Sequence, residues 1–557
     1  MQEFIYYNPN GLDFPISEEI FVTSNIEDGA KSDFLISNSP LIKSELTAKE
    51  VDFYIKNSKD SLSNKIENVS TLYEIAATKY DLSQDISYNQ ELNNEVLLIA
   101  NNEEEYKIFV EKTLDEDFNL FYITTDLLKS ISGHIGNLSV IVDDEGKDVT
   151  LNVSQIVWFD AKEEGLKQSG TFDPNLSSLD EVIKQLKDNI ENYEYRKFIT
   201  YDSSICQYHE RREEICSRCE DVCPTVAITK DDKTKTLSFS MVDCLGCGGC
   251  ISICPSGSLE YTPMSRTSIY EVSKFYSGKI PLIIPSKMNM ENLSIDLKEN
   301  VLPFAIDGEK FLDESMFITI AQESGSQVVF YSDFLSKGTR NAIDIINQIY
   351  QKKYSKDAVI VAANEEELSE ALKEVDLIEN SRFTFNHTSS KKREIFAIRL
   401  KHIVGDEDLG TVSTGEFVHY GKIQVKEENC TLCLSCVGAC NVDALVADAR
   451  DNTLRINSSL CTSCGYCLVT CPEADCISIE SDVIHLNKTW FTEEILAQDE
   501  LFACVECGKE FATTKAINKI AAIMSPLFAS NPVKQRTLYC CEDCKAKLMI
   551  KQGLLDA

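Results

Sequence analysis

The chain has 557 residues, and 54 basic against 90 acidic side chains give it a formal net charge of −36. A chain of this length is too long for one hydrophobic core and is expected to divide into several domains. The acidic balance argues against binding to nucleic acid or anionic lipid, and it suits a protein that is steered to a basic patch on a partner.

The first 30 residues lack the basic start and following apolar run of a secretory signal. The longest apolar runs, such as Val96–Ala100 and Pro281–Pro285, fall far short of the roughly 20 residues that span a bilayer. We therefore expect a soluble, cytoplasmic protein without a membrane span.

Residues 1–90 are polar and predict a helical, partly irregular lead-in, with an amphipathic stretch at Leu62–Lys79. Region 91–200 predicts a small α/β domain with a βαβ unit, a hairpin and a final helix. The expected elements are strands Glu95–Ala100 and Phe118–Thr124 around helix Glu103–Leu114, hairpin strands Leu138–Val142 and Val149–Phe159, and helix Ser178–Tyr195.

Region 265–385 predicts a second α/β domain, with a small and largely parallel sheet covered by helices. The expected strands are Lys279–Ile284, Leu302–Ile306, Gln327–Tyr331 and Ala358–Ala362, and the helices are Lys310–Glu323, Thr339–Tyr350 and Glu365–Val375. Residues 386–420 begin with a polar and basic stretch and predict a linker.

The 22 cysteines are confined to parts of the chain, with none before Cys206 and none between Cys254 and Cys430. In a long chain without an export signal, clustered cysteines indicate metal sites more than disulfides. The second block contains two runs with the spacing C-x2-C-x2-C-x3-C, which are Cys430, Cys433, Cys436 and Cys440, and Cys461, Cys464, Cys467 and Cys471.

In such paired runs, the fourth thiolate of each run ligates the cluster of the other run. We therefore predict one [4Fe–4S] cluster on Cys430, Cys433, Cys436 and Cys471, and a second on Cys461, Cys464, Cys467 and Cys440. Cys476 is left over and is expected to be a surplus buried thiol.

The first block repeats this plan with one stretched gap. Its predicted cluster sets are Cys244, Cys247, Cys250 and Cys223, and Cys206, Cys216, Cys219 and Cys254. Nine residues separate Cys206 from Cys216, and they include His209. Because imidazole can replace thiolate on iron, Cys206, His209 or neither could complete this cluster.

Both blocks resemble bacterial-type two-cluster ferredoxin domains, over roughly Tyr201–Tyr261 and Gly421–His485. The second block departs from the family pattern at Asn441, where proline is usual, and through a short insertion at Ala474–Cys476. Neither departure removes a predicted ligand, although the turn after Cys440 is expected to be looser.

The C-terminal cysteines follow a different pattern, with two C-x2-C pairs on either side of a helical stretch at Thr513–Met524. Cys504, Cys507, Cys541 and Cys544 predict a closed structural Zn²⁺ site, with an iron site or unmetallated thiols as alternatives. Cys540 is expected to be a bystander, with an exchange of roles with Cys541 as the alternative.

The prediction is therefore an α+β multidomain protein in which two 2[4Fe–4S] ferredoxin-like domains alternate with small α/β regions, before a zinc-knuckle-like module. The expected segments are the lead-in 1–90, α/β domain 91–200, ferredoxin domain 201–264, α/β domain 265–385, linker 386–420, ferredoxin domain 421–488 and four-cysteine module 489–557.

The order of these parts, with the stretches Tyr201–Pro224, Tyr420–Cys433 and Cys504–Phe511, resembles large bacterial 4Fe–4S, polyferredoxin-like proteins. Proteins of that family are commonly encoded beside molybdenum- or tungsten-dependent formate dehydrogenases. The resemblance implies a role in formate oxidation, either passing electrons or helping the dehydrogenase to mature.

Two functions are therefore expected as alternatives. The first is electron transfer through four clusters in two pairs, with the α/β regions spacing the pairs, and the second is an accessory or assembly role. A catalytic role is disfavoured because the sequence contains neither a Gly-x-Gly-x-x-Gly motif after a strand nor a Walker motif.

Overall fold

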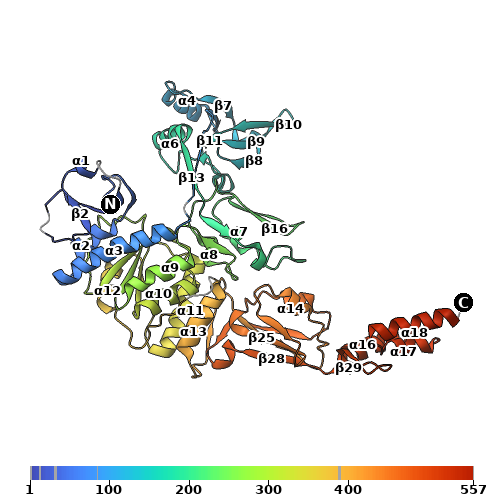
Figure 1. Ribbon diagram of the computed structural model, residues 1–557. Coiled ribbons are helices and arrows are strands. Elements are labelled where there is room, and N and C mark those ends of the chain that lie inside the picture. The colour runs from blue at the N-terminus through green and yellow to red at the C-terminus, as the bar shows by residue number, and fades with distance from the viewer. Residues whose placement is uncertain (1–2, 12–13, 30–33, 85, 387–390, 556–557) are drawn as a thin grey trace.

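The computed structural model describes residues 3–11, 14–29, 34–84, 86–386 and 391–555. Figure 1 shows a central α/β body, flanked by the N-terminal sheet and by the regions that carry the cysteines, with the C-terminal helices at one end of the molecule. No helix in this described part is long and apolar enough to cross a membrane.

The described part of residues 1–90 has a helix at the expected amphipathic stretch, but it also contains a parallel four-stranded sheet with the order β2-β1-β3-β4 that the helical, partly irregular lead-in did not include. Its elements are β1 (Phe4–Tyr7), β2 (Ile20–Thr23), α1 (Ile26–Gly29), β3 (Phe34–Ser37), β4 (Ser44–Thr47), α2 (Glu50–Asn57) and α3 (Leu62–Leu82). The strands have four residues each, too few for an alternation pattern to stand out from the polar sequence around them. The Tyr73 hydroxyl donates to Ile5 O at 2.8 Å and joins α3 to this sheet.

Region 91–200 has the predicted βαβ unit, in which β6 and β7 pair in parallel on either side of α4. The expected strand Val149–Phe159 is two strands, because the chain turns at Ser154 from the hairpin into the parallel sheet β12-β11-β6-β7. The elements are β5 (Ser87–Gln90), β6 (Glu95–Ile99), α4 (Glu103–Lys112), β7 (Asn119–Ile123), β8 (Leu128–His134), β9 (Asn137–Asp144), β10 (Lys147–Val153), β11 (Gln155–Trp158), α5 (Glu163–Leu166), β12 (Thr171–Phe172), α6 (Leu179–Glu191) and β13 (Tyr193–Arg196).

Region 265–385 has the predicted parallel sheet, with the order β19-β18-β20-β21. The two central strands are buried along their whole length, as expected where helices cover both faces of a parallel sheet. The elements are α9 (Arg266–Ser273), β18 (Ile280–Pro285), β19 (Val301–Ile306), α10 (Glu314–Ser324), β20 (Val328–Tyr331), α11 (Lys337–Tyr354), β21 (Val359–Ala362) and α12 (Glu365–Glu374).

The expected linker 386–420 contains the 13-residue helix α13 (Lys392–Val404), while residues 387–390 of that prediction lie outside the described residues. Lys392, Arg393 and Arg399 are 1%, 3% and 0% exposed, so the basic residues that suggested a linker are in fact buried. The prediction was wrong because local composition does not show that buried carboxylates, such as Glu323 beside Arg399 at 2.7 Å, neutralise such residues.

The two cysteine regions repeat one plan, in which an outer antiparallel strand pair and an inner hairpin enclose the cysteine loops (Figure 1). The first region has β14 (Ile199–Tyr201), α7 (Arg218–Asp221), β15 (Ile228–Asp231), β16 (Thr236–Phe239), α8 (Gly249–Ser252) and β17 (Leu259–Tyr261). The second has β22 (Thr411–Ser413), β23 (Gly421–Val425), α14 (Ser435–Ala439), β24 (Leu445–Asp448), β25 (Thr453–Asn457), α15 (Tyr466–Thr470), β26 (Ile477–Ser481), β27 (Val483–His485) and β28 (Glu493–Gln498).

The C-terminal module follows β28 directly and consists of a short hairpin and three helices. Its elements are β29 (Leu501–Ala503), β30 (Glu510–Thr513), α16 (Thr514–Met524), α17 (Pro532–Thr537) and α18 (Glu542–Leu555). The Thr513 hydroxyl donates to Thr431 O at 2.9 Å, so the module packs against the second cysteine region.

Candidate metal centres

The cysteine loops use left-handed backbone on both sides of the middle cysteine. The φ angles are +51° and +59° at Leu432 and Leu434, and +65° and +80° at Gly246 and Gly248. Turns of this kind direct successive backbone N–H groups inward and form anion-binding concavities. Leucine adopts this conformation at a cost, and such strain is typical of functional sites.

Gly248 is required for a second reason, which is the close approach of the second α/β domain. A Cβ at this position would lie 2.4 Å from Phe311 Cβ. Cys247 O also accepts a hydrogen bond from Lys310 N at 3.0 Å. This cysteine loop is therefore held directly on the α/β body.

The structure brings the sixteen motif cysteines together in four groups, which we number by their order in space. Group 1 is Cys223, Cys244, Cys247 and Cys250, group 2 is Cys206, Cys216, Cys219 and Cys254, group 3 is Cys440, Cys461, Cys464 and Cys467, and group 4 is Cys430, Cys433, Cys436 and Cys471. These are the sets expected from crossed ligation, in which each run contributes its last cysteine to the other group.

The thiols of each group lie beside one another, and all of them except the exposed Cys433 are buried or half-buried. Burial, together with the charges of Cys254 and Cys206, raises the pKa of Cys216 in group 2 to about 12. Burial and the neighbouring cysteines likewise raise the pKa of Cys436 in group 4 to about 12. A bound metal must displace the protons of such thiols, so loading of these sites weakens as pH falls.

Groups 2 and 4 each line a small cavity, of about 20 Å³ and 10 Å³. Their backbone supplies donors to sulfur, as where Tyr208 N approaches Cys206 Sγ at 3.5 Å. The same contact recurs in group 3, where Ser463 N approaches Cys461 Sγ at 3.4 Å.

Cys206, and not His209, lies in group 2. The His209 ring packs edge-on against Tyr201, and its Nε2 is 3.8 Å from the Glu210 carboxylate. The residues that line the group 2 cavity include Cys206 but not His209. Of the alternatives left open by the stretched gap, this arrangement favours the one with four cysteines.

Cys476, which was expected to be a surplus buried thiol, is 3% exposed and lies against group 4. Burial and the neighbouring Cys430 and Cys471 raise its pKa to about 12, so it is a neutral thiol that can donate a hydrogen bond. No motif spacing marks this position, and the insertion at Ala474–Cys476 was the one available signal.

The four groups form a continuous series. The charge of Cys219 in group 2 raises the pKa of Cys250 in group 1, so these two groups are neighbours. In the same way, Cys436 of group 4 raises the pKa of Cys467 in group 3. Groups 2 and 3 face each other across the contact between the two cysteine regions. We had expected the α/β regions to separate the two pairs of groups. Instead, the two pairs meet directly.

Direct hydrogen bonds build this contact between groups 2 and 3. Asn441 Nδ2 donates to Cys206 O at 3.0 Å and to Ser204 O at 3.2 Å. Gln207 Nε2 donates to the Thr462 hydroxyl. Arg211 donates to Ala439 O at 2.8 Å, and its guanidinium lies 4.4 Å from the centre of the Tyr466 ring. Asn441, the departure from the ferredoxin pattern, thus joins the two regions and does not leave a loose turn.

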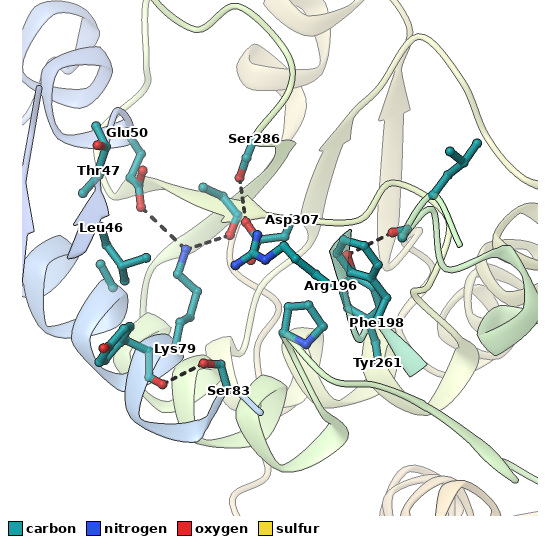
Figure 2. A pocket seen from close by; sticks show the side chains of 17 residues that line it. Leu46, Thr47, Glu50, Lys79, Ser83, Arg196, Phe198, Tyr261, Ser286 and Asp307 are labelled. Carbon is teal, nitrogen blue, oxygen red and sulfur yellow. Dashed lines mark hydrogen bonds and ion pairs between the residues drawn. The ribbon is translucent and has the colours of Figure 1, made fainter. Parts of the chain in front are cut away.

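A pocket adjoins group 1 and was not expected from the sequence (Figure 2). Leu245 and Gly246 of the cysteine loop form part of its wall, and Tyr261 OH donates to Gly246 O at 3.0 Å. Opposite them, Lys79 lies 3.7 Å from the Glu50 carboxylate and donates to Ala305 O at 3.1 Å. No sequence motif marks these residues, because they come from three separate regions of the chain.

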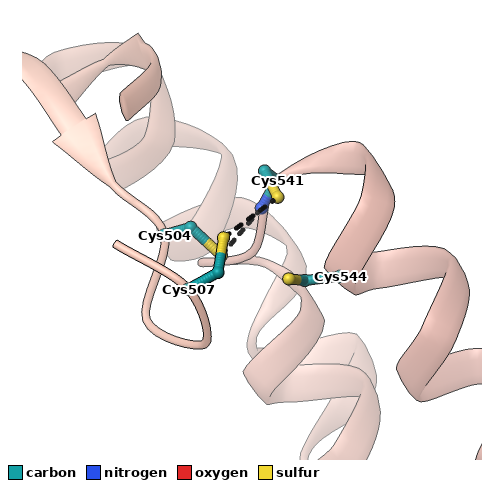
Figure 3. A group of neighbouring side chains, drawn as sticks. All are labelled: Cys504, Cys507, Cys541 and Cys544. Atoms are coloured by element: carbon teal, nitrogen blue, oxygen red, sulfur yellow. Dashed lines mark hydrogen bonds between the residues drawn. The ribbon is translucent and has the colours of Figure 1, made fainter. Parts of the chain in front are cut away.

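The C-terminal cysteines form a separate group (Figure 3). The Sγ atoms of Cys504, Cys507, Cys541 and Cys544 all lie within 4.8 Å of one another. Burial alone would raise the pKa of Cys504, but hydrogen bonds from the backbone N–H groups of Cys541, Glu506 and Cys507 lower it to about 6. Cys540 lies outside this group and donates to Arg536 O at 3.3 Å. The arrangement is compatible with a closed metal site.

Comparison with known families identifies both cysteine regions. A family described as "4Fe-4S dicluster domain" matches residues 215–258, and a second family of the same description matches residues 422–472. No curated protein matches the chain. The chain therefore contains two ferredoxin-type 4Fe-4S dicluster domains, which support an iron–sulfur electron-transfer role. Cys206 and Cys476 lie outside the matched residues.

The residues present fit iron–sulfur clusters. Each group offers four converging sulfur ligands, which is the donor set that such clusters take from proteins. In addition, the Arg393 cation is buried between groups 2 and 3 without a carboxylate partner among the described residues, and this matches the negative charge of thiolate-bound clusters.

Proposed function

We propose that the protein is an electron carrier with four [4Fe–4S] clusters, one in each cysteine group, held by the ligands that the sequence predicts. Bound clusters of this kind supply redox chemistry at potentials between about −700 and +450 mV. The observation that carries the proposal is the continuous series of four groups across two domains in direct contact. The chain itself contributes the thiolates and fixes their order.

We propose a formate dehydrogenase as the redox partner. The support is the resemblance of the cysteine stretches and their order to proteins encoded beside such enzymes. Oxidation of formate to carbon dioxide releases two electrons and one proton, and a chain of one-electron sites can accept the two electrons in successive steps. The net charge of −36 suits docking to a basic surface on the enzyme.

Metal analysis of anaerobically purified protein, followed by reductive titration monitored by EPR, tests the carrier role. We expect about sixteen iron atoms per chain and signals from four clusters that accept electrons from a low-potential donor. Iron at this level that no such donor reduces would contradict the proposal.

A strain that lacks the protein separates the carrier role from an accessory role. Formate dehydrogenase that keeps its cofactor and clusters, but no longer passes electrons onward, supports the carrier. An enzyme that lacks its cofactor or clusters supports the accessory role in assembly.

A further inference from the structure

Two buried cations begin helix α13, at the contact between the two dicluster domains. Lys392 is neutralised, because its ammonium lies 3.0 Å from the Glu314 carboxylate and 3.8 Å from that of Asp313. Arg393 is 3% exposed, and among the residues that the structure describes no carboxylate forms an ion pair with it. Carbonyl groups and an aromatic ring contact the guanidinium, but a buried charge that no anion neutralises is costly, so Arg393 favours a counter-charge nearby.

The contacts of Arg393 indicate where that counter-charge lies. Its Nε donates to Pro255 O at 2.6 Å, directly after Cys254 of group 2. Its Nη1 donates to Cys461 O at 3.2 Å, in group 3. Its Nη2 donates to His419 O at 2.7 Å, and the guanidinium stacks 3.8 Å from the centre of the Tyr420 ring. The cation is thus fixed between one cysteine of each facing group.

We propose that Arg393 is a positioning residue for electron transfer, whose charge stabilises added negative charge at groups 2 and 3 together and thereby sets the potentials at the domain junction. This inference rests on the proposed carrier function. An electron that arrives without a proton makes a site more negative by one charge, and net charge is among the factors that set cluster potentials. Because the cation lies close to both groups, it favours reduction of both. The difference between their potentials therefore stays small, which suits electron transfer between the domains.

The test is an EPR-monitored redox titration of the whole protein with Arg393→Gln and Arg393→Lys. Arg393→Gln keeps hydrogen-bond donors but removes the charge, and we expect two of the four midpoint potentials to shift to more negative values. Arg393→Lys keeps the charge, and we expect it to leave those two potentials close to their original values.

Lys391→Gln is the matched control, since it removes a positive charge one residue before the buried pair from a side chain that is 51% exposed. We expect it to leave all four potentials unchanged. If groups 2 and 3 bind no clusters in Arg393→Gln but bind them in Arg393→Lys, the positive charge is required for cluster assembly at the junction. This result would also support the inference.

Three results would overturn the inference. One is four reducible clusters with unchanged potentials in Arg393→Gln, another is an equal shift in Arg393→Lys, and the third is failure of both variants to load. Clusters that no donor reduces in the unmodified protein would instead refute the carrier function itself, so the two failures are distinguishable.

Discussion

The ferredoxin pattern is irregular at two points, and at each of them a single cysteine joins one of the groups. The stretched gap in the first domain allows Cys206 to reach Cys216, Cys219 and Cys254, while His209 packs against Tyr201. The insertion in the second domain places a fifth thiol, Cys476, beside group 4. Both positions lie outside the residues that the family comparison covers.

Replacing Cys206 tests the composition of group 2. We expect Cys206→Ala to lower the iron content by up to about a quarter, because one of four clusters loses a ligand. His209→Ala is the control from the same loop and is expected to retain all the iron. Iron analysis and EPR of anaerobic protein provide the measurement, and iron loss in His209→Ala with none in Cys206→Ala would reverse the assignment.

Replacing Cys476 tests a role in tuning. Its buried thiol lies beside Cys430 and Cys471 of group 4, and hydrogen bonds to sulfur are among the factors that set cluster potentials. We therefore expect Cys476→Ala to keep the iron content but shift one midpoint potential to more negative values. Cys540→Ala, which removes a buried thiol far along the chain, serves as the control, and loss of a whole cluster in Cys476→Ala would show that Cys476 is a ligand.

At the scale of elements, helix α13 joins the α/β body to both dicluster domains. Its Arg399 is completely buried and lies 2.7 Å from the Glu323 carboxylate of α10, which also accepts from the Thr384 hydroxyl at 2.8 Å. Its first residues contact Cys254 O, Pro255 O and Cys461 O. One helix therefore links the central core to groups 2 and 3.

Breaking the ion pair between Arg399 and Glu323 should destabilise this helix. We expect Arg399→Met to lower the free energy of unfolding by about 3–5 kcal/mol, because it leaves a buried carboxylate unpaired. The double variant Arg399→Met with Glu323→Leu removes both charges and should recover most of the loss. Denaturant unfolding followed by circular dichroism measures both, and a double variant no more stable than the single one would contradict this account.

At the scale of the whole molecule, the C-terminal module has its own cysteine group and packs against the second dicluster domain. Lys515 donates to Glu427 O at 2.8 Å, and Lys519 pairs with Glu473, which in turn accepts from the Thr431 hydroxyl at 2.8 Å. These contacts lie beside the group 4 loop. The module can therefore protect that loop without sharing its metal.

We predict about one zinc ion per chain at Cys504, Cys507, Cys541 and Cys544. Because a closed site of this kind contributes folding energy directly, Cys544→Ser should abolish zinc binding and unfold the hairpin and helices around it. Cys540→Ser, outside the group, should keep the zinc. Metal analysis and limited proteolysis of the module provide the readouts, and iron in place of zinc would contradict the metal assignment.

The sequence by itself determined the elements whose pattern is local. The spacing of the sixteen cysteines predicted which of them would meet, since a C-x2-C-x2-C run closes within one loop and crossed ligation follows from paired runs. The alternation of strand-like and helical segments between Lys279 and Val375 predicted the parallel sheet, because parallel neighbours need a crossover connection, usually a helix.

The tertiary structure alone decided what depends on contacts between distant segments. The charges on Lys392, Arg393 and Arg399 suggested a linker, but carboxylates and carbonyl groups from other regions surround them. Asn441 seemed only a departure from a pattern until its amide was found bonded to Cys206 O. Burial of a charged side chain is a property of its surroundings, and many of those surroundings here come from residues more than 60 positions away along the chain.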